Sequence, residues 1–236
     1  VFAVGLAVTF ATGLSSNSGA NVTASPTANT TYTVTGTAPI TGCSNTANVT
    51  VTVNPNPNVT IPTPSAICAG SSTTLTATGA GGLGPYSYSW SPSTGLSSTT
   101  LATVTANPST TTTYTVTVTD SRGCTGTNTV TVTVNAIPIV NAGNDLSICN
   151  GSGANTLTGY SPTTGSWSGA GVTPAGVFTP SNLGNFTLTY TVTQSGCTAT
   201  DQIVVTVINP SAANAGLDQG ICLNAAPINL TGTPIN

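Results

Sequence analysis

One stretch of this 236-residue chain, residues 109–135 (STTTTYTVTVTDSRGCTGTNTVTVTVN), occurs in two further copies and limits what the chain can fold into. Within it, valine and tyrosine alternate with threonine on both sides of a short DSRGC segment. A period of two in β-branched and aromatic residues is typical of a strand with one buried face. The DSRGC segment contains turn formers, so the stretch predicts a β-hairpin. A single hairpin cannot bury its own apolar face, and we therefore expect a second sheet.

The copies at residues 30–54 and 187–208 show that the chain is a tandem array. Each copy has a Gly-Cys step before its second strand, and an Ile-Cys step recurs at a separate set of positions. The Gly-Cys and Ile-Cys series are Cys43, Cys124 and Cys197, and Cys68, Cys149 and Cys222. Both series advance by 81 and then 73 residues. Fixed-period self-similarity indicates a repeat architecture, with a module of about that length.

The scarcity of charge excludes several function classes. Charged residues make up 2% of the chain, against about 25% in ordinary globular proteins. With one Arg and no Lys, the chain cannot neutralise a phosphate backbone, so we expect no nucleic-acid partner. There is no His or Glu for acid–base chemistry, and we expect no catalytic, cofactor-binding or metal-ligating residue and no enzyme activity. The chain contains no run of about 18 apolar residues, so we expect no insertion into a membrane.

The six cysteines predict structural disulfides. A zinc site is disfavoured because the chain has no histidine and no Cys-x-x-Cys pair. Regularly spaced cysteines in such a chain indicate an oxidising, extracellular location, on a cell surface or in a secreted filament.

The predicted fold class is all-β, with tandem β-sandwich modules arranged end to end. Its predicted parts are the C-terminal half of a module (1–54), two complete modules (55–136 and 137–209) and the N-terminal half of another (210–236). The aromatic side chains predicted for the cores are Trp90, Tyr114, Trp167 and Tyr190. The tyrosine of each hairpin is predicted to bind nearby backbone through its hydroxyl.

The two half-modules complement each other, because together they have about the length of one complete module. Either the chain is a window from a longer covalent array, or separate subunits associate head to tail by strand addition. The first is favoured because half-modules expose sheet edges. In both cases residue 236 of one unit is expected to lie next to residue 1 of the following unit.

The order of these motifs resembles a known group of modules. Ile-Cys-x-Gly, a Leu-Thr run, a Trp strand, Thr-Tyr-Thr-Val and Gly-Cys before a Val-Thr-Val strand are similar to immunoglobulin-like modules of giant surface proteins of Bacteroidota. The Asn-Ala-Gly-x-Asp segments at Asn141 and Asn214 resemble the PKD-like subtype. The resemblance implies a β-sandwich exported by type IX secretion that serves as the stalk of an adhesin.

Two disulfide patterns are open. Pairing within modules gives Cys68–Cys124 and Cys149–Cys197 and leaves Cys43 and Cys222 for the broken ends. The immunoglobulin-type topology that the resemblance implies places Cys68 and Cys124 at opposite ends of one sandwich. A ten-residue strand is about 33 Å long, and a disulfide tolerates Cα separations of only about 4.4–6.8 Å. This favours the alternative, a bond between modules such as Cys68–Cys197.

Two functions are consistent with the sequence. The first is a structural repeat of an adhesin stalk or filament, made of copies of itself and stiffened by disulfides. The second is a binding module that recognises a glycan or a host ligand through loops such as residues 79–85. Near-identical modules favour the stalk, because a binding specialist is expected to carry one unlike domain.

Overall fold

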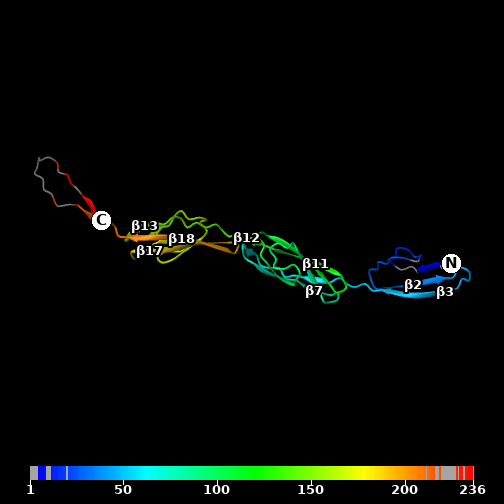
Figure 1. Ribbon diagram of the computed structural model, residues 1–236. Coiled ribbons are helices and arrows are strands. Elements are labelled where there is room, and N and C mark those ends of the chain that lie inside the picture. The colour runs from blue at the N-terminus through cyan, green and yellow to red at the C-terminus, as the bar shows by residue number, and fades with distance from the viewer. Residues whose placement is uncertain are drawn as a thin grey trace. The chain divides into compact units, whose positions relative to one another are not determined.

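The computed structural model describes residues 5–8, 12–19, 21–210, 212–215, 218, 227, 229–230 and 232–235. The regular secondary structure of these residues consists of β-strands alone (Figure 1). The chain is divided into two compact units. The first comprises Val1–Pro64, Thr73–Asn107 and Thr113–Val132, and the second Ser65–Ser72, Pro108–Thr112 and Thr133–Asn236. The predicted all-β class of sandwich modules is confirmed.

The first unit begins with a three-stranded antiparallel sheet in the order β1-β2-β3, made of β1 (Gly5–Val8), β2 (Thr30–Thr37) and β3 (Ser44–Val51). β2 and β3 form the predicted hairpin, with Tyr32 opposite Val49. Tyr32 is buried, whereas Val49 on the neighbouring strand is exposed.

The rest of the first unit buries its apolar side chains between short sheets. The strands are β4 (Asn58–Thr60), β6 (Thr73–Thr76), β7 (Thr78–Ala80), β8 (Ser87–Ser91), β9 (Thr103–Ala106), β10 (Thr112–Thr119) and β11 (Thr125–Val132). They form a β11-β10-β8 sheet and the antiparallel pairs β4-β7 and β6-β9. Alternation along β10 buries Tyr114, Val116 and Val118, as the period of two predicts. Leu96 is only half-buried and lies in a loop outside the named strands.

The second unit contains a four-stranded sheet in the order β13-β18-β17-β15 and a two-stranded sheet, β14-β16. Their bounds are β13 (Leu146–Cys149), β14 (Asn155–Thr156), β15 (Ser166–Ser168), β16 (Val177–Phe178), β17 (Gly184–Gln194) and β18 (Cys197–Ile208). Phe178 from the small sheet joins Leu188, Tyr190 and Val205 from the large sheet in a single buried cluster. The two sheets therefore share one core, as a sandwich requires.

The second unit also contains two parallel pairings that involve very short strands. β13 runs parallel to the end of β18, and β5 (Ile67–Cys68) runs parallel to β12 (Val134–Asn135). β19 (Ala212–Asn214) and β20 (Thr233–Ile235) form an antiparallel pair. Segment 65–72 thus groups with the second unit through its pairing with β12 and its covalent bond to β18.

Candidate functional site at a disulfide-bonded joint

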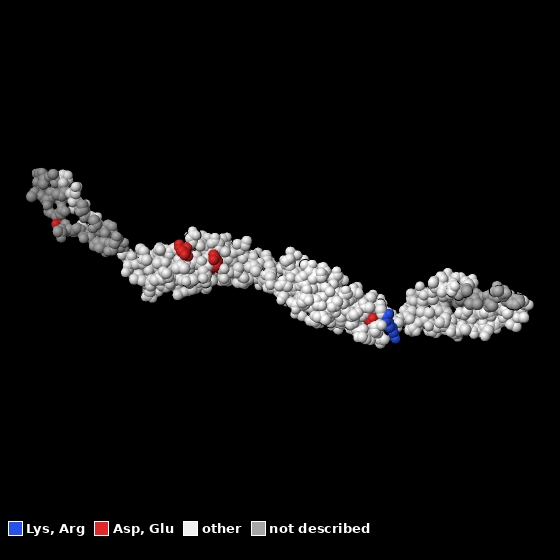
Figure 2. Space-filling model, in the orientation of Figure 1, with Lys and Arg blue, Asp and Glu red and all other residues white. Residues whose placement is uncertain are grey.

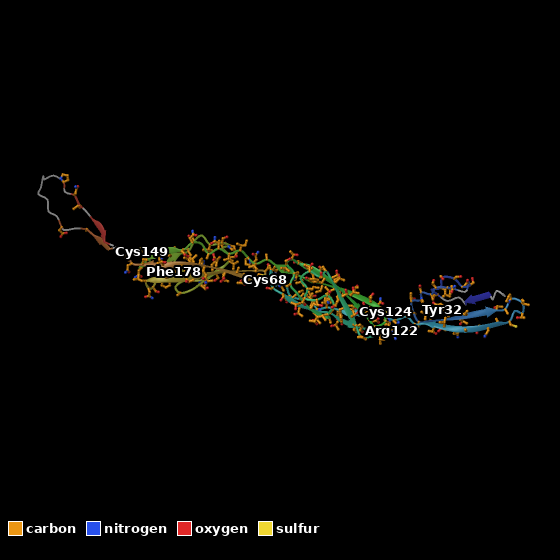
Figure 3. All side chains as sticks on the ribbon, viewed as in Figure 1. Tyr32, Cys68, Arg122, Cys124, Cys149 and Phe178 are labelled. Carbon is orange, nitrogen blue, oxygen red and sulfur yellow. A yellow bond between two sulfur atoms is a disulfide. The ribbon has the colours of Figure 1, made fainter. Side chains whose placement is uncertain are left out.

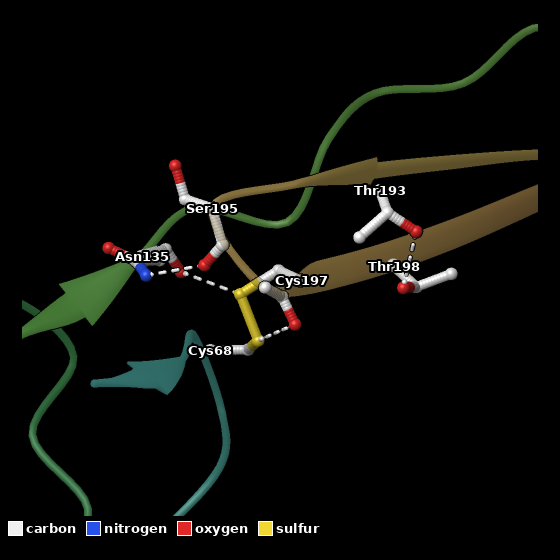
Figure 4. Close-up of a disulfide and its surroundings, with 7 residues drawn as sticks. Cys68, Asn135, Thr193, Ser195, Cys197 and Thr198 are labelled. Carbon is white, nitrogen blue, oxygen red and sulfur yellow. Dashed lines mark hydrogen bonds between the residues drawn. A yellow bond between two sulfur atoms is a disulfide. The ribbon is translucent and has the colours of Figure 1, made fainter. Parts of the chain in front are cut away.

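A disulfide joins Cys68 to Cys197, with a Cα–Cα distance of 5.6 Å (Figure 4). The bonded residues are 129 positions apart, and both belong to the second unit. This is the pairing between predicted modules that the topology argument favoured. We call the residues around it, 67–69, 133–135 and 194–197, the stapled joint.

Pairing with β12 fixes the first cysteine. In the parallel pair β5-β12, Ile67 lies opposite Val134 and Cys68 opposite Asn135. The Ile67 N–H donates to the Thr133 carbonyl, and the Ala69 N–H donates to the Asn135 carbonyl, both at 2.9 Å. Cys68 is therefore held beside the last residue of β12.

A tight turn presents the second cysteine. Gly196 has a φ of 81° and Ser195 a φ of 51°, a left-handed conformation that favours glycine. Asn135 Nδ2 donates to the Ser195 carbonyl at 2.7 Å, which ties β12 to the turn. The Cys197 sulfur lies 3.9 Å from the Asn135 carbonyl oxygen (Figure 4). The joint therefore combines one covalent bond with a side-chain hydrogen bond to the same turn.

The within-module pairings are absent from the structure. Cys149 ends β13 opposite Ile208, the last residue of β18, whereas Cys197 is the first residue of β18. Eleven residue steps along a strand span about 36 Å, far beyond the reach of a disulfide. Among the described residues Cys43, Cys124 and Cys149 are free thiols, and Cys222 lies outside those residues.

A related contact occurs in the first unit at the equivalent positions. Arg122 Nη1 donates to Asn54 Oδ1. These residues occupy corresponding positions in the repeat. Asn54 and Asn135 lie eleven residues after Cys43 and Cys124, respectively. Arg122 and Ser195 lie two residues before Cys124 and Cys197, respectively. Figure 3 labels Arg122 and Cys124 close together. An asparagine that ends one hairpin thus binds the next Gly-Cys turn in both places.

Asp120 organises a turn in a way that the sequence did not reveal. Its Oδ1 accepts hydrogen bonds from the Arg122 and Cys124 N–H groups at 2.9 Å each, and its Oδ2 accepts one from the Leu83 N–H at 3.1 Å. Burial raises the pKa of this carboxyl, but these three backbone donors and the Arg122 charge outweigh that effect and hold the pKa below its usual value. The loop at residues 79–85, proposed as a ligand-binding loop, is therefore anchored to the hairpin turn.

Two other aspartates also bind backbone groups. Asp201 Oδ2 accepts from the Ala142 N–H at 2.8 Å, and Asp145 Oδ1 accepts from the Val204 N–H at 2.7 Å. The N–H groups of Ala142 and Gln202 lower the pKa of Asp201, against a smaller opposing effect of burial. Within the described ranges, no three His, Cys, Asp or Glu side chains are grouped so that they could hold a metal ion.

The structure buries all four aromatic side chains predicted for the cores, Trp90, Tyr114, Trp167 and Tyr190. The hydroxyls of Tyr32, Tyr114 and Tyr190 donate to the carbonyls of Thr12, Thr94 and Pro162, respectively. Trp90 Nε1 donates to the Leu101 carbonyl at 2.9 Å, whereas the buried Trp167 Nε1 has no partner in the described part of the chain. These residues are used for packing rather than for ligand stacking.

The described surface is almost free of charge (Figure 2). The described part of the chain contains no helix that could span a membrane.

No protein-family model matches the chain, and no curated protein matches it in sequence. Among solved structures, the chain is similar to extracellular domains 3–5 of Drosophila OTK, with 11% identity, a TM-score of 0.39 and coverage of 88% of this chain and 86% of that one. It is also similar to three N-terminal domains of the outer capsid protein Hoc of bacteriophage RB49, with 16% identity, a TM-score of 0.40 and coverage of 87% and 89%. A third similarity is to the insect immune protein hemolin, with 14% identity, a TM-score of 0.36 and coverage of 75% of this chain and 56% of that one.

Proposed function

We propose that this chain is a structural repeat segment of an extracellular adhesin stalk or filament, built from sandwich modules that follow one another head to tail. An all-β repeat fold with a disulfide fits a structural or adhesion module of an extracellular protein. The resemblance in motif order supports the finer proposal that it belongs to a surface adhesin of Bacteroidota exported by type IX secretion.

The stapled joint is the observation that carries this proposal. β5, which carries Cys68, pairs with β12 at the end of one hairpin. The Cys68–Cys197 bond ties β5 to the turn of the next hairpin, β17-β18. The Asn135–Ser195 contact and the Asn54–Arg122 contact repeat the same relation at two places along the chain. Reinforcement of connections between repeats suits a protein that transmits load along its chain.

The surface chemistry supports the same role. Nucleic-acid or membrane-surface binding needs clustered basic residues, and the chain has a single arginine that is engaged with Asn54. The described residues hold no group of three His, Cys, Asp or Glu side chains that could bind a metal ion. A surface rich in threonine, serine and asparagine carries few charges for salt to screen. The interactions of such a surface therefore change little over a wide range of ionic strength.

Electron microscopy of the native material tests the proposal. We expect fibres with a repeat of whole modules, in the culture medium or attached to cells, that a label on an exposed residue decorates at regular intervals. Compact, monodisperse particles of this protein in the native material would contradict the stalk and would favour a discrete binding module.

A further inference from the structure

Strand β3 exposes an apolar side chain that the other two copies of the strand bury. Val49 lies six residues after Cys43 and is 54% exposed. Val130 and Ile203, each six residues after its own Gly-Cys cysteine, are 5% and 2% exposed. In the first unit, the strand that carries Val130 contacts β4, and Asn128 Nδ2 donates to the Val59 carbonyl there. The β1-β2-β3 sheet has no such covering strand among the described residues.

The other end of the chain has the complementary feature. The Leu-Thr runs that follow the Ile-Cys motifs bury their leucines in the two complete copies, where Leu75 is 1% and Leu157 is 3% exposed. Leu230, in the third run, is 80% exposed. Leu230 is thus the exposed apolar residue of a front half, and Val49 is that of a back half. In a complete module, both halves contribute to one core.

Cys149 occupies the position that Cys68 has in the stapled joint. Cys149 lies opposite Ile208 in the parallel pair β13-β18, and the Asn150 N–H donates to the Ile208 carbonyl at 2.7 Å. Cys68 lies opposite Asn135 in the same way. The next turn is also shared, since the Ser152 and Ser71 N–H groups each donate to the carbonyl of the cysteine three residues before. Cys149 differs in one respect, which is that its thiol is exposed and unbonded.

Cys43 occupies the position that Cys197 has in the stapled joint. It follows Gly42, whose φ of 67° corresponds to the 81° of Gly196. The Ala38 N–H donates to the Cys43 carbonyl at 2.9 Å and closes the β2-β3 hairpin. Its thiol is also exposed and unbonded.

We propose that a second copy of this chain places its Val49 face against Leu230 of the first, and that Cys149 of the first copy then forms a disulfide with Cys43 of the second. This rests on the head-to-tail function proposed above. Cys68 lies in one predicted module and bonds to the Gly-Cys turn of the following module. By the same relation, Cys149 would bond to the Gly-Cys turn of the module after its own. The front half of that module carries Leu230. The back half that completes that module carries Cys43 as its Gly-Cys cysteine.

The bond forms by oxidation of two thiols. The two sulfurs lose two protons and two electrons, which a small disulfide such as oxidised glutathione accepts as it becomes two molecules of reduced glutathione. An oxidising extracellular compartment supplies oxidants of this class.

A cysteine-limited background tests the bond directly. In the full 236-residue chain with Cys124→Ser and Cys222→Ser, only the Cys68–Cys197 pair, Cys43 and Cys149 remain. Incubation with oxidised and reduced glutathione, followed by non-reducing electrophoresis, should give a ladder of covalent multimers. Adding either Cys43→Ser or Cys149→Ser should leave monomers, and a mixture of those two variants should stop at the dimer. Pepsin is the protease of choice for mapping the link, because one Arg and no Lys leave trypsin almost no sites.

Several outcomes would overturn the proposal. A dimer in either single variant would show bonding between identical cysteines, and a Cys43–Cys149 peptide recovered only from monomers would show closure within one chain. A Val49→Asp variant should lose the ladder, whereas Thr46→Asp, an exposed residue on the opposite face of β3, should retain it. Equal ladders from both variants would also contradict the proposed contact.

Light scattering under reducing conditions separates this proposal from the head-to-tail function. If the chains associate and form fibres but no Cys43–Cys149 peptide is found, the disulfide assignment fails and the filament stands. If the chains stay monomeric at high concentration with or without oxidant, the association of copies proposed here fails, whereas a stalk whose modules are joined in one covalent chain stands.

Discussion

At the scale of single residues, three tyrosines connect hairpin strands to preceding loops. The hydroxyls of Tyr32 and Tyr114 each donate to a carbonyl twenty residues earlier in the chain. Tyr190 makes two hydrogen bonds, since its hydroxyl donates to the Pro162 carbonyl and accepts from the Gly165 N–H. The repeated tyrosine therefore makes a polar contact in addition to packing its ring in the core.

Removal of a tyrosine hydroxyl should lower the free energy of unfolding in proportion to the number of backbone groups that lose a hydrogen-bond partner. We expect Tyr114→Phe to lower the free energy of unfolding by about 1 kcal/mol and Tyr190→Phe by about 2 kcal/mol, because the latter leaves two partly buried backbone groups unpaired. Tyr88→Phe is the control, since no hydrogen bond of its hydroxyl is found in the described structure. Calorimetric unfolding measures all three. If Tyr190→Phe were no more destabilising than Tyr88→Phe, the assigned hydrogen bonds would be wrong.

Asp120 should make the first unit sensitive to acid. Its pKa is lowered in the folded state, so the stabilisation is present at neutral pH and is lost as the pH falls below about 3.9, the ordinary aspartate value, and through the folded pKa. Asp120→Asn should destabilise the turn at pH 7, because an amide cannot accept from Leu83, Arg122 and Cys124 together. The difference from the native protein should shrink at pH 2.

A titration followed by near-ultraviolet circular dichroism measures this effect, with Asp218→Asn as the control because Asp218 is exposed. A difference between Asp120→Asn and the native chain that is the same at pH 7 and pH 2 would contradict an ionised acceptor at this position.

At the scale of strands, close approach of backbone limits which residues β11 can carry. A Cβ on Gly126 would lie 1.9 Å from the Pro57 carbonyl oxygen, so the strand must shift if the residue is not glycine. The equivalent position of the second unit, two residues after Cys197, is Ala199 and has room for its methyl group. The same position in the repeat is thus constrained in one copy only.

Gly126→Ala should therefore destabilise the first unit by about 1–3 kcal/mol through overpacking against backbone. Ala199→Gly is the matched control, and we expect it to cost about 1 kcal/mol or less. Thermal unfolding followed by circular dichroism compares the two. A neutral Gly126→Ala variant would show that the segment around Pro57 can move away at no cost.

The hairpins, the core aromatics and the tyrosine contacts could be predicted from sequence, because each depends on local alternation or on a residue repeated at a fixed place. The parallel pairs β5-β12 and β13-β18 could not be, because strands of two to four residues carry too little periodicity to indicate a distant partner. The anchoring of Asp120 was missed for a similar reason, since Leu83 is 37 residues away. The disulfide pairing could not be predicted uniquely, because it depends on how the turn before Cys197 contacts the end of β12.

At the scale of the whole chain, stability depends on a covalent bond and little on charge. Charged residues are 2% of the sequence, and the formal net charge is −3. Ion pairs between exposed residues contribute little even where they are common. We attribute the cohesion of the chain to its valine-rich cores and to the Cys68–Cys197 bond.

Replacement of both Cys68 and Cys197 by Ser should lower the free energy of unfolding of the second unit by about 2–4 kcal/mol, because the bond closes a loop of 129 residues. Cys149→Ser in the monomer should have almost no effect, since that thiol is exposed and unbonded. Urea titration of both variants gives the comparison. A double variant as stable as the native chain would show that the bond contributes nothing to the folded state of one subunit.

The parallel pairing of β13 with the end of β18 has a mechanical consequence. The chain enters the sandwich of the second unit through the β13 side and leaves it after Ile208, and the two strands point the same way. A pull on both sides of residues 146–208 therefore slides β13 along β18 and strains their hydrogen bonds together, whereas an antiparallel pair pulled from one end would open one bond at a time. The strand that ends in Cys149 would then resist tension before the rest of the sandwich is loaded.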